Sequence, residues 1–106
     1  MATIKWTKKA ERIFFERVEE AFVKFGLSTA KKWQTERMRI EHQLELYPES
    51  YKPEALLADR KRFYRSCHIM KRFILVYYYA KSSDVIYVVD IWDSRQAPEN
   101  LKKRIK

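Results

Sequence analysis

Glycine, proline and cysteine are scarce in this chain of 106 residues, which holds one Gly, three Pro and one Cys. A flexible linker needs runs of small or proline residues, so their scarcity predicts one domain over residues 1–106. With Cys67 alone no internal disulfide can form, which is typical of a protein of the reducing cytoplasm. The longest apolar stretch, residues 73–80, is too short to cross a bilayer. No apolar run follows the first basic residues, so we expect a cytoplasmic protein with no signal peptide and no membrane association.

Metal and cofactor motifs are also missing. His42, Cys67 and His68 do not form a metal-ligand set of any usual spacing, and no Gly-rich phosphate loop occurs. Cys67 and His68 are neighbours on a predicted strand, so their side chains point to opposite faces and cannot form a nucleophile–base pair. We therefore expect no metal and no small-molecule cofactor.

Positive charge is abundant, with 23 Lys and Arg against 14 Asp and Glu, a net charge of +9. Residues 47–106 supply most of this excess, and it favours a polyanionic partner, either nucleic acid or an acidic protein segment. A solvated basic surface that serves solubility is the alternative. The predicted nucleic-acid-binding residues are Arg60, Lys61, Arg62, Lys71, Lys102 and Lys103.

Apolar spacing in the first half predicts a short strand at residues 2–6 and then two amphipathic helices. Thr7 can cap the first helix through its hydroxyl, and Gly26 ends it through a left-handed backbone. Ser28 is the expected cap of a second helix that runs to about Leu46, before Pro48. The apolar positions of the first helix are Ala10, Phe14, Val18, Ala21, Phe22 and Phe25. Those of the second are Ala30, Trp33, Ile40, Leu44 and Tyr47, with Arg37 interrupting them.

The second half changes to β-branched and aromatic residues. Strands are expected at residues 62–69, 72–79 and 85–92, with residues 81–84 as a hairpin turn. The end, residues 98–106, predicts one basic helical turn or a frayed tail. The fold class is therefore α+β, in the order β-α-α-β-β-β. A helical hairpin should cover one face of a mostly antiparallel four-stranded sheet, leaving the other face as a concave, basic surface rich in aromatic side chains.

Three stretches resemble those of the RelE/ParE superfamily, in the same order and over nearly the whole chain. The first is residues 4–10, Ile-Lys-Trp-Thr-Lys-Lys-Ala. The second is Tyr64-Arg65, followed by the run at residues 74–77, Ile-Leu-Val-Tyr. The third is residues 91–98, Ile-Trp-Asp-Ser-Arg-Gln-Ala-Pro, followed by Leu101. The resemblance implies the toxin of a type II toxin–antitoxin system, of the plasmid-stabilisation type, held inactive by a cognate antitoxin.

Members of this superfamily attack one of two targets: RelE-like toxins cut mRNA on the ribosome, and ParE-like toxins poison DNA gyrase. In the nucleolytic members an Arg opens the middle strand, where this chain has Ile74. Arg72, two residues earlier on the same strand face, could replace it. The position of the general acid or base on the last strand is Asp93, and Arg95 matches the basic residue that follows.

Metal-free RNA cleavage needs a base, an acid and cations for the transition-state charge. The predicted catalytic residues are Arg65, Arg72, Asp93 and Arg95. Asp93 could act as a base only if its pKa were raised, whereas neighbouring arginines lower it. Four tyrosines are either proton donors, stacking platforms or plain sheet residues: Tyr77, Tyr78, Tyr79 and Tyr87. His68 is either a strand residue or a catalytic one.

Three hypotheses follow. The leading one is a ribosome-dependent endoribonuclease that needs no metal, an mRNA interferase that inhibits growth. The second is a non-hydrolytic inhibitor of DNA gyrase, which Ile74 and Asp93 favour because a binding surface needs no acid–base pair. The third is an RNA-binding or interaction module without toxicity.

Overall fold

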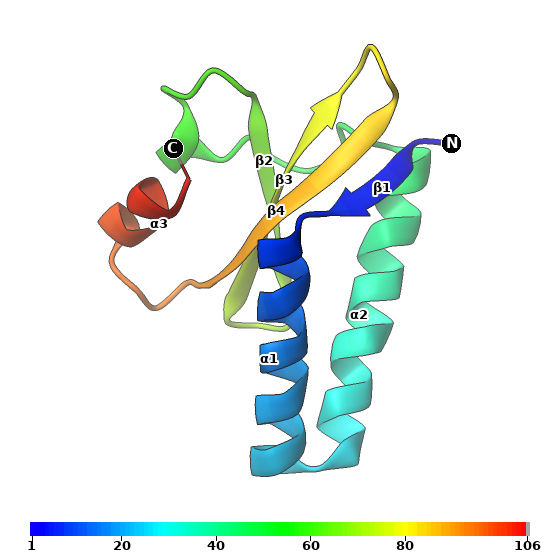
Figure 1. Ribbon diagram of the computed structural model, residues 1–106, viewed down its shortest axis with the longest axis vertical. Coiled ribbons are helices and arrows are strands. Elements are labelled where there is room, and N and C mark those ends of the chain that lie inside the picture. The colour runs from blue at the N-terminus through cyan, green and yellow to red at the C-terminus, as the bar shows by residue number, and fades with distance from the viewer. Residues whose placement is uncertain (106) are drawn as a thin grey trace.

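The computed structural model describes residues 1–105 and confirms the α+β class and the order of elements (Figure 1). The elements are β1 (Thr3–Trp6), α1 (Lys8–Phe25), α2 (Leu27–Leu46), the 3₁₀ turn η1 (Ala55–Leu57), β2 (Tyr64–Ile69), β3 (Phe73–Ala80), β4 (Val85–Asp93) and α3 (Pro98–Arg104). Each predicted strand lies within two residues of the observed one. The short helix α3 stands where one helical turn or a frayed tail was expected.

The four strands form one sheet in the order β1-β4-β3-β2. β1 runs parallel to β4, and the other neighbours are antiparallel. Val76 pairs with Asp90 while Tyr77 pairs with Val88, so Val89 is an extra residue in β4. Such a bulge bends its strand and increases the local twist.

The ends of the helices follow local chemistry. The Thr7 hydroxyl accepts a hydrogen bond of 3.1 Å from the backbone N–H of Ala10, as expected of an N-cap. Gly26 has φ +93°, a backbone that side-chain-bearing residues rarely adopt, and it joins the two helices. The prediction that Ser28 caps α2 is wrong. The helix begins at Leu27, and Gly26 at its N-cap offers no side chain.

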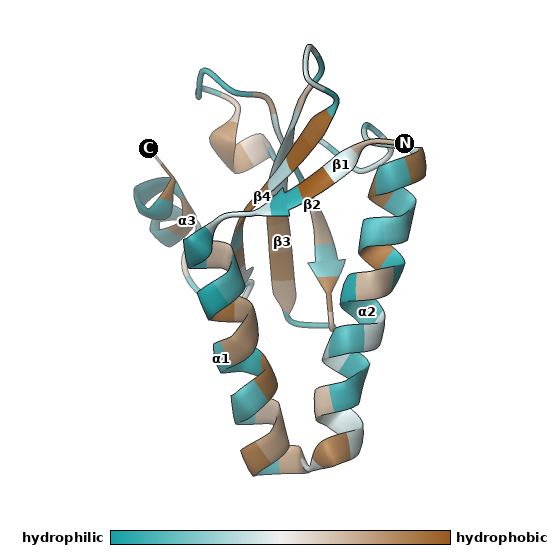
Figure 2. Ribbon diagram, turned by 45° about the vertical axis from the view of Figure 1, so that its right-hand side comes forward, coloured by the Kyte–Doolittle hydropathy of each residue, from teal (hydrophilic) through white to brown (hydrophobic). Residues whose placement is uncertain are grey.

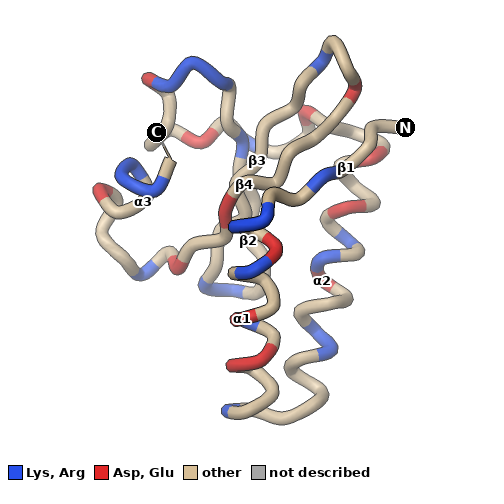
Figure 3. Tube along the Cα trace, in the orientation of Figure 1, with Lys and Arg blue, Asp and Glu red and all other residues tan. Residues whose placement is uncertain are grey.

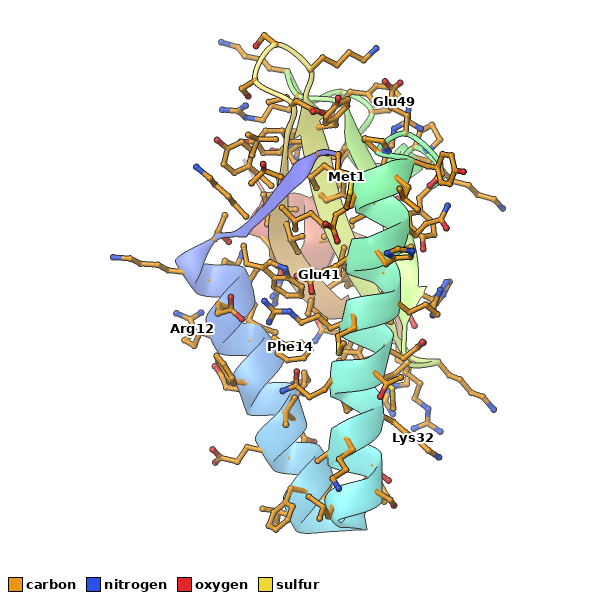
Figure 4. All side chains as sticks on the ribbon, turned by 90° about the vertical axis from the view of Figure 1, so that its right-hand side faces the viewer. Met1, Arg12, Phe14, Lys32, Glu41 and Glu49 are labelled. Carbon is orange, nitrogen blue, oxygen red and sulfur yellow. The ribbon has the colours of Figure 1, made fainter. Side chains whose placement is uncertain are left out.

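The main core lies between the helical hairpin and the sheet. Its buried residues include Ala10, Phe14, Trp33, Ile40, Leu44, Leu75, Tyr77, Ile86 and Val88. Phe14 and Glu41 lie between α1 and α2 (Figure 4). Arg37, which interrupts the apolar spacing of α2, belongs here: its guanidinium lies 3.8 Å from the Trp6 ring centroid and ion-pairs with Glu11.

The hairpin extends beyond the sheet at its Gly26 end, where apolar residues gather (Figures 1 and 2). Phe22 and Phe25, predicted on the buried side of α1, are 54 % and 71 % exposed. Tyr47, just past the end of α2, is also exposed. α1 starts at Lys8, directly after β1 ends at Trp6, and runs out past the β2–β3 turn, so its last turn has no sheet beneath it (Figure 1).

The second face of the sheet, opposite the helical hairpin, is partly covered. A second core covers part of it, made of Leu57, Tyr64, Val76, Trp92, Leu101 and Ile105. Leu101 and Ile105 are four residues apart and so lie on one side of α3, facing the sheet. The apolar side chains that β3 and β4 present on this face explain why the C-terminal segment folds onto them instead of fraying.

Candidate functional site

A groove of about 890 Å³ lies where the β2–β3 turn meets the helical hairpin. Its apolar residues come from both helices and from the turn, and they are Ala21, Phe25, Trp33, Met70 and Phe73. The groove lies against the part of the hairpin that extends past the strands. An apolar groove of this kind can accept the apolar face of a helical segment of a partner.

The charged rim of the groove is mostly basic. Five cations line it, namely Arg17, Lys32, Arg39, Lys71 and Arg72, with two carboxylates, Glu20 and Glu36. Both carboxylates are already paired, Glu20 with Arg17 at 2.9 Å and Glu36 with Arg39 at 2.7 Å. Lys32, Lys71 and Arg72 have no ion-pair partner within residues 1–105 and are free to meet an anion.

Arg72, Asp93 and Arg95 of the predicted catalytic set lie at this end of the sheet. The backbone N–H and the hydroxyl of Ser94 donate to the carbonyl of Arg72 at 2.8 and 2.9 Å, which joins the start of β3 to the exit of β4. Figure 3 shows the charged residues at this turn and along the neighbouring helices. Three residues of that set therefore lie at the same end of the sheet, around the Ser94–Arg72 hydrogen bonds.

Asp93 is held as an anion. Arg95 donates to it through Nη2 at 2.6 Å and Nε at 3.0 Å, and its backbone N–H adds a third bond of 2.9 Å. These hydrogen bonds lower the pKa of Asp93 to about 2. A carboxylate with so low a pKa is a weak base at neutral pH, so this pair can bind and orient but is poorly suited to abstract a proton.

Arg65 lies apart from the other three. It pairs across the sheet with Tyr77, whereas Asp93 pairs with Phe73 four residues along β3. Its guanidinium donates to the carbonyl of Tyr51 at 2.8 Å and lies 3.5 Å from Glu49. Arg65 thus holds the loop after α2 against the sheet edge.

The predicted nucleic-acid-binding residues divide between two places. Lys71 lies at the groove, whereas the other five surround η1 and α3 on the second face. Arg60 donates to the carbonyls of Ile105 at 3.0 Å and Lys102 at 2.8 Å, so it anchors the end of α3. The Arg62 guanidinium lies 4.4 Å from the Tyr78 ring centroid. Lys61, Lys102 and Lys103 are exposed.

The tyrosines have different surroundings. Tyr77 is fully buried, its hydroxyl donates to the carbonyl of Pro48 at 3.0 Å, and burial raises its pKa. The Tyr79 hydroxyl donates to Asp84 at 2.6 Å, which also raises its pKa. Neither is placed to give up a proton at neutral pH. Tyr78 and Tyr87 stack with ring centroids 5.1 Å apart on the second face.

Sequence reasoning missed the helical side of the groove and the place of His68. His68 is exposed and lines the groove beside Lys71 and Arg72. No spacing in the sequence signals this site, because how far the hairpin extends past the sheet depends on where α1 starts relative to the strands. Among residues 1–105 no group of three or more His, Cys, Asp or Glu is placed to hold a metal ion. None of the helices described is both long and apolar enough to cross a membrane.

Comparisons with known proteins place the fold. No curated protein matches the chain. A chain of the chromosomal ParDE toxin–antitoxin system from P. aeruginosa superposes with a TM-score of 0.67 at 16 % identity, over 88 % of this chain and 96 % of that one. A metal-bound toxin from Helicobacter pylori gives 0.59 at 20 % identity, over 90 % and 97 %. The isolated E. coli RelE toxin gives 0.58 at 14 % identity, over the whole of both chains.

These structural similarities show a shared fold, whereas membership of a family rests on the match to a family model. The model of the ParE toxin of the type II toxin–antitoxin system parDE matches residues 4–98. That range runs from β1 through β4 to the first residue of α3, and it contains the groove and the Asp93–Arg95 pair. The chain therefore belongs to the ParE toxin family of type II toxin–antitoxin systems.

Proposed function

We propose that residues 1–106 form one toxin domain that acts in the cytoplasm by binding DNA gyrase without hydrolysis, and that a cognate antitoxin neutralises it. The Asp93–Arg95 pair carries this proposal. The position where a nuclease of this superfamily needs an acid or base holds a carboxylate whose pKa is about 2. Ile74, where those nucleases have an Arg, supports the same reading.

Membership of the ParE family adds to the argument, because ParE-like toxins act on gyrase through a binding surface. Such a surface needs cations and apolar contacts but no proton transfer. The groove offers Lys71 and Arg72 without acidic partners in residues 1–105, and it is also lined by the exposed ring of Phe25.

The antitoxin is the second partner of the proposal. We expect an acidic, amphipathic segment that is disordered alone and folds into the groove as it binds. Its apolar side chains would pack on Trp33 and Met70, and its carboxylates would meet Lys32, Lys71 and Arg72. Binding there would cover the cations that the target needs.

One experiment tests the target. Purified toxin is added to a gyrase supercoiling assay and, in parallel, to a reconstituted translation reaction in which mRNA ends are mapped. We expect supercoiling to be inhibited, with inhibition lost in Lys71→Ala/Arg72→Ala and retained in the matched variant Lys61→Ala/Lys102→Ala. Normal supercoiling together with new cuts in ribosome-bound mRNA would contradict the proposal.

Ribosome-dependent mRNA cleavage is the second candidate, and one observation favours it. His68 lines the groove beside Lys71 and Arg72, so an imidazole and two cations share one surface. If this candidate holds, His68→Gln abolishes the mRNA cuts while leaving the fold intact. If gyrase is the target, the same variant inhibits supercoiling as the natural chain does.

A further inference from the structure

Four residues lie in register across the whole sheet, one from each strand. Lys5 pairs with Tyr87, Tyr87 with Tyr78, and Tyr78 with Tyr64. Their neighbours in the strands, Trp6, Ile86, Val88 and Tyr77, pack in the core beneath the helical hairpin. Because side chains alternate along a strand, the Lys-Tyr-Tyr-Tyr row points to the second face. It lies away from the groove.

The aromatic rings of this row form a column. Tyr78 and Tyr87 stack with centroids 5.1 Å apart and planes at 26°, and Tyr64 meets Tyr78 edge-on at 5.8 Å. The Arg62 guanidinium lies 4.4 Å from the Tyr78 ring centroid. Tyr87, at the other end of the pair, has no second aromatic or cation–π partner within residues 1–105.

The exposure of the four side chains shows which end of the row solvent can reach. Tyr64 is 8 % exposed and belongs to the second core, covered from the side of η1. Tyr78 and Tyr87 are half-buried and Lys5 is exposed. α3 and η1 cover the part of this face nearer Trp92, so the end at Tyr87 and Lys5 is left accessible.

We propose that this row is a binding platform for single-stranded nucleic acid, in which a base stacks on Tyr87 and Lys5 meets a backbone phosphate. A base would extend the Tyr78–Tyr87 column by one ring, since every base has a π-face that an aromatic side chain can stack against. Arg62 closes the column at its other end and adds positive charge. The platform does not depend on the proposed target, because it uses none of the residues of the groove.

A purely structural role is the alternative, in which the rings only cover the sheet. The two roles predict different effects of substituting Tyr87. Tyr87→Leu keeps an apolar side chain over the sheet but removes the π-face, whereas Tyr87→Phe keeps both. Structural cover also makes no distinction between an oligonucleotide with bases and one without them.

The test is fluorescence anisotropy with the full-length toxin and labelled 12-residue oligonucleotides. Single-stranded RNA and single-stranded DNA of one sequence and an abasic strand of equal length are compared. We expect both single strands to bind more tightly than the abasic strand, and the tighter of the two identifies the preferred sugar. Tyr87→Leu should weaken binding by at least ~5-fold, the loss of one base stack, and Tyr87→Phe should retain it.

Control measurements distinguish base stacking from charge attraction and from misfolding of the variant. Tyr47→Leu changes an exposed tyrosine elsewhere and should bind as the natural chain does. Thermal unfolding followed by circular dichroism verifies that Tyr87→Leu is folded. Equal affinity for the abasic strand, an unchanged affinity of Tyr87→Leu, or equally effective competition by poly-glutamate would each overturn the proposal.

Discussion

Arg104 of α3 and Asp90 of β4 form a two-point ion pair, with Nε 2.8 Å from Oδ2 and Nη2 2.7 Å from Oδ1. Asp90 is fully buried, and the only other cation paired with it among residues 1–105 is Lys9, at 3.4 Å. A buried carboxylate that loses its partner is strongly unfavourable. The C-terminal helix is therefore fixed to the sheet by charge as well as by Leu101 and Ile105.

The first prediction concerns this ion pair. Arg104→Met should lower the free energy of unfolding by about 3 kcal/mol, because it leaves Asp90 buried with Lys9 alone. Urea denaturation followed by circular dichroism measures this change. Lys103→Met, on the exposed side of the same helix, should change it by less than about 0.5 kcal/mol. Equal midpoints for the two variants would mean that α3 is held by apolar contacts alone.

The second prediction concerns Arg37, the charge that interrupts the apolar spacing of α2. Its guanidinium lies 3.8 Å from the Trp6 ring centroid and 4.7 Å from that of Phe14, and it pairs with Glu11. Arg37→Met should lower the free energy of unfolding by about 2 kcal/mol, since the two cation–π contacts and the ion pair are lost together. Urea denaturation provides the measurement.

Arg39→Met is the matched control for Arg37, two residues away on the same helix. Within residues 1–105 its guanidinium forms an ion pair with Glu36 alone, and its side chain is 56 % exposed. We expect a change below about 0.5 kcal/mol there, because an exposed ion pair contributes little. A larger loss in Arg39→Met than in Arg37→Met would contradict the buried role of Arg37.

The sequence predicted the strands and both long helices because their signals are local: alternation, apolar spacing and caps such as Thr7. It failed where the answer depended on how the elements are placed relative to one another. Phe22 and Phe25 follow the apolar spacing of α1 and are nevertheless exposed, since the sheet does not reach them. Leu101 and Ile105 are buried against side chains of β3 and β4, such as Val76 and Trp92, which no local spacing connects to α3.

The candidate site also combines local features, which the sequence predicts, with contacts between distant segments, which it does not. Asp93 and Arg95 are two residues apart, so their pairing is a local property, and the low pKa of Asp93 follows from it. Lys71 and Arg72 meet Lys32 and Trp33 only because the hairpin folds over the β2–β3 turn. No spacing in the sequence connects these two segments. The place of Arg65, at the loop after α2, is likewise set by the pairing of β2 with β3.

Cys67 provides a third prediction, which tests the main core. Burial raises the pKa of its thiol from 9.0 to about 12. At pH 8 the reactive thiolate is then depleted ~1000-fold relative to an ordinary thiol. Iodoacetamide should alkylate the folded protein at least ~100-fold more slowly than the protein in guanidinium, as followed by mass spectrometry.

His68→Cys in a Cys67→Ser background is the control for this experiment, because position 68 is exposed on the same strand. That thiol should be alkylated nearly as fast in the folded as in the unfolded protein. Rapid labelling of Cys67 itself, in a protein that circular dichroism shows to be folded, would mean that β2 is detached from the core.

The fourth prediction joins the pH dependence of Asp93 to the choice between binding and cleavage. The hydrogen bonds from Arg95 lower the pKa of Asp93 from 3.8 to about 2. The stabilisation from this pair is therefore complete above pH 3.8 and is lost as the pH falls through about 2. Carbon-13 NMR of the Asp93 carboxyl should give a midpoint near 2 in the natural chain and a higher one, toward 3.8, in Arg95→Gln.

Arg72→Gln, the matched control, should leave the midpoint unchanged. A midpoint near neutral pH would instead make Asp93 a usable base and favour mRNA cleavage over gyrase binding.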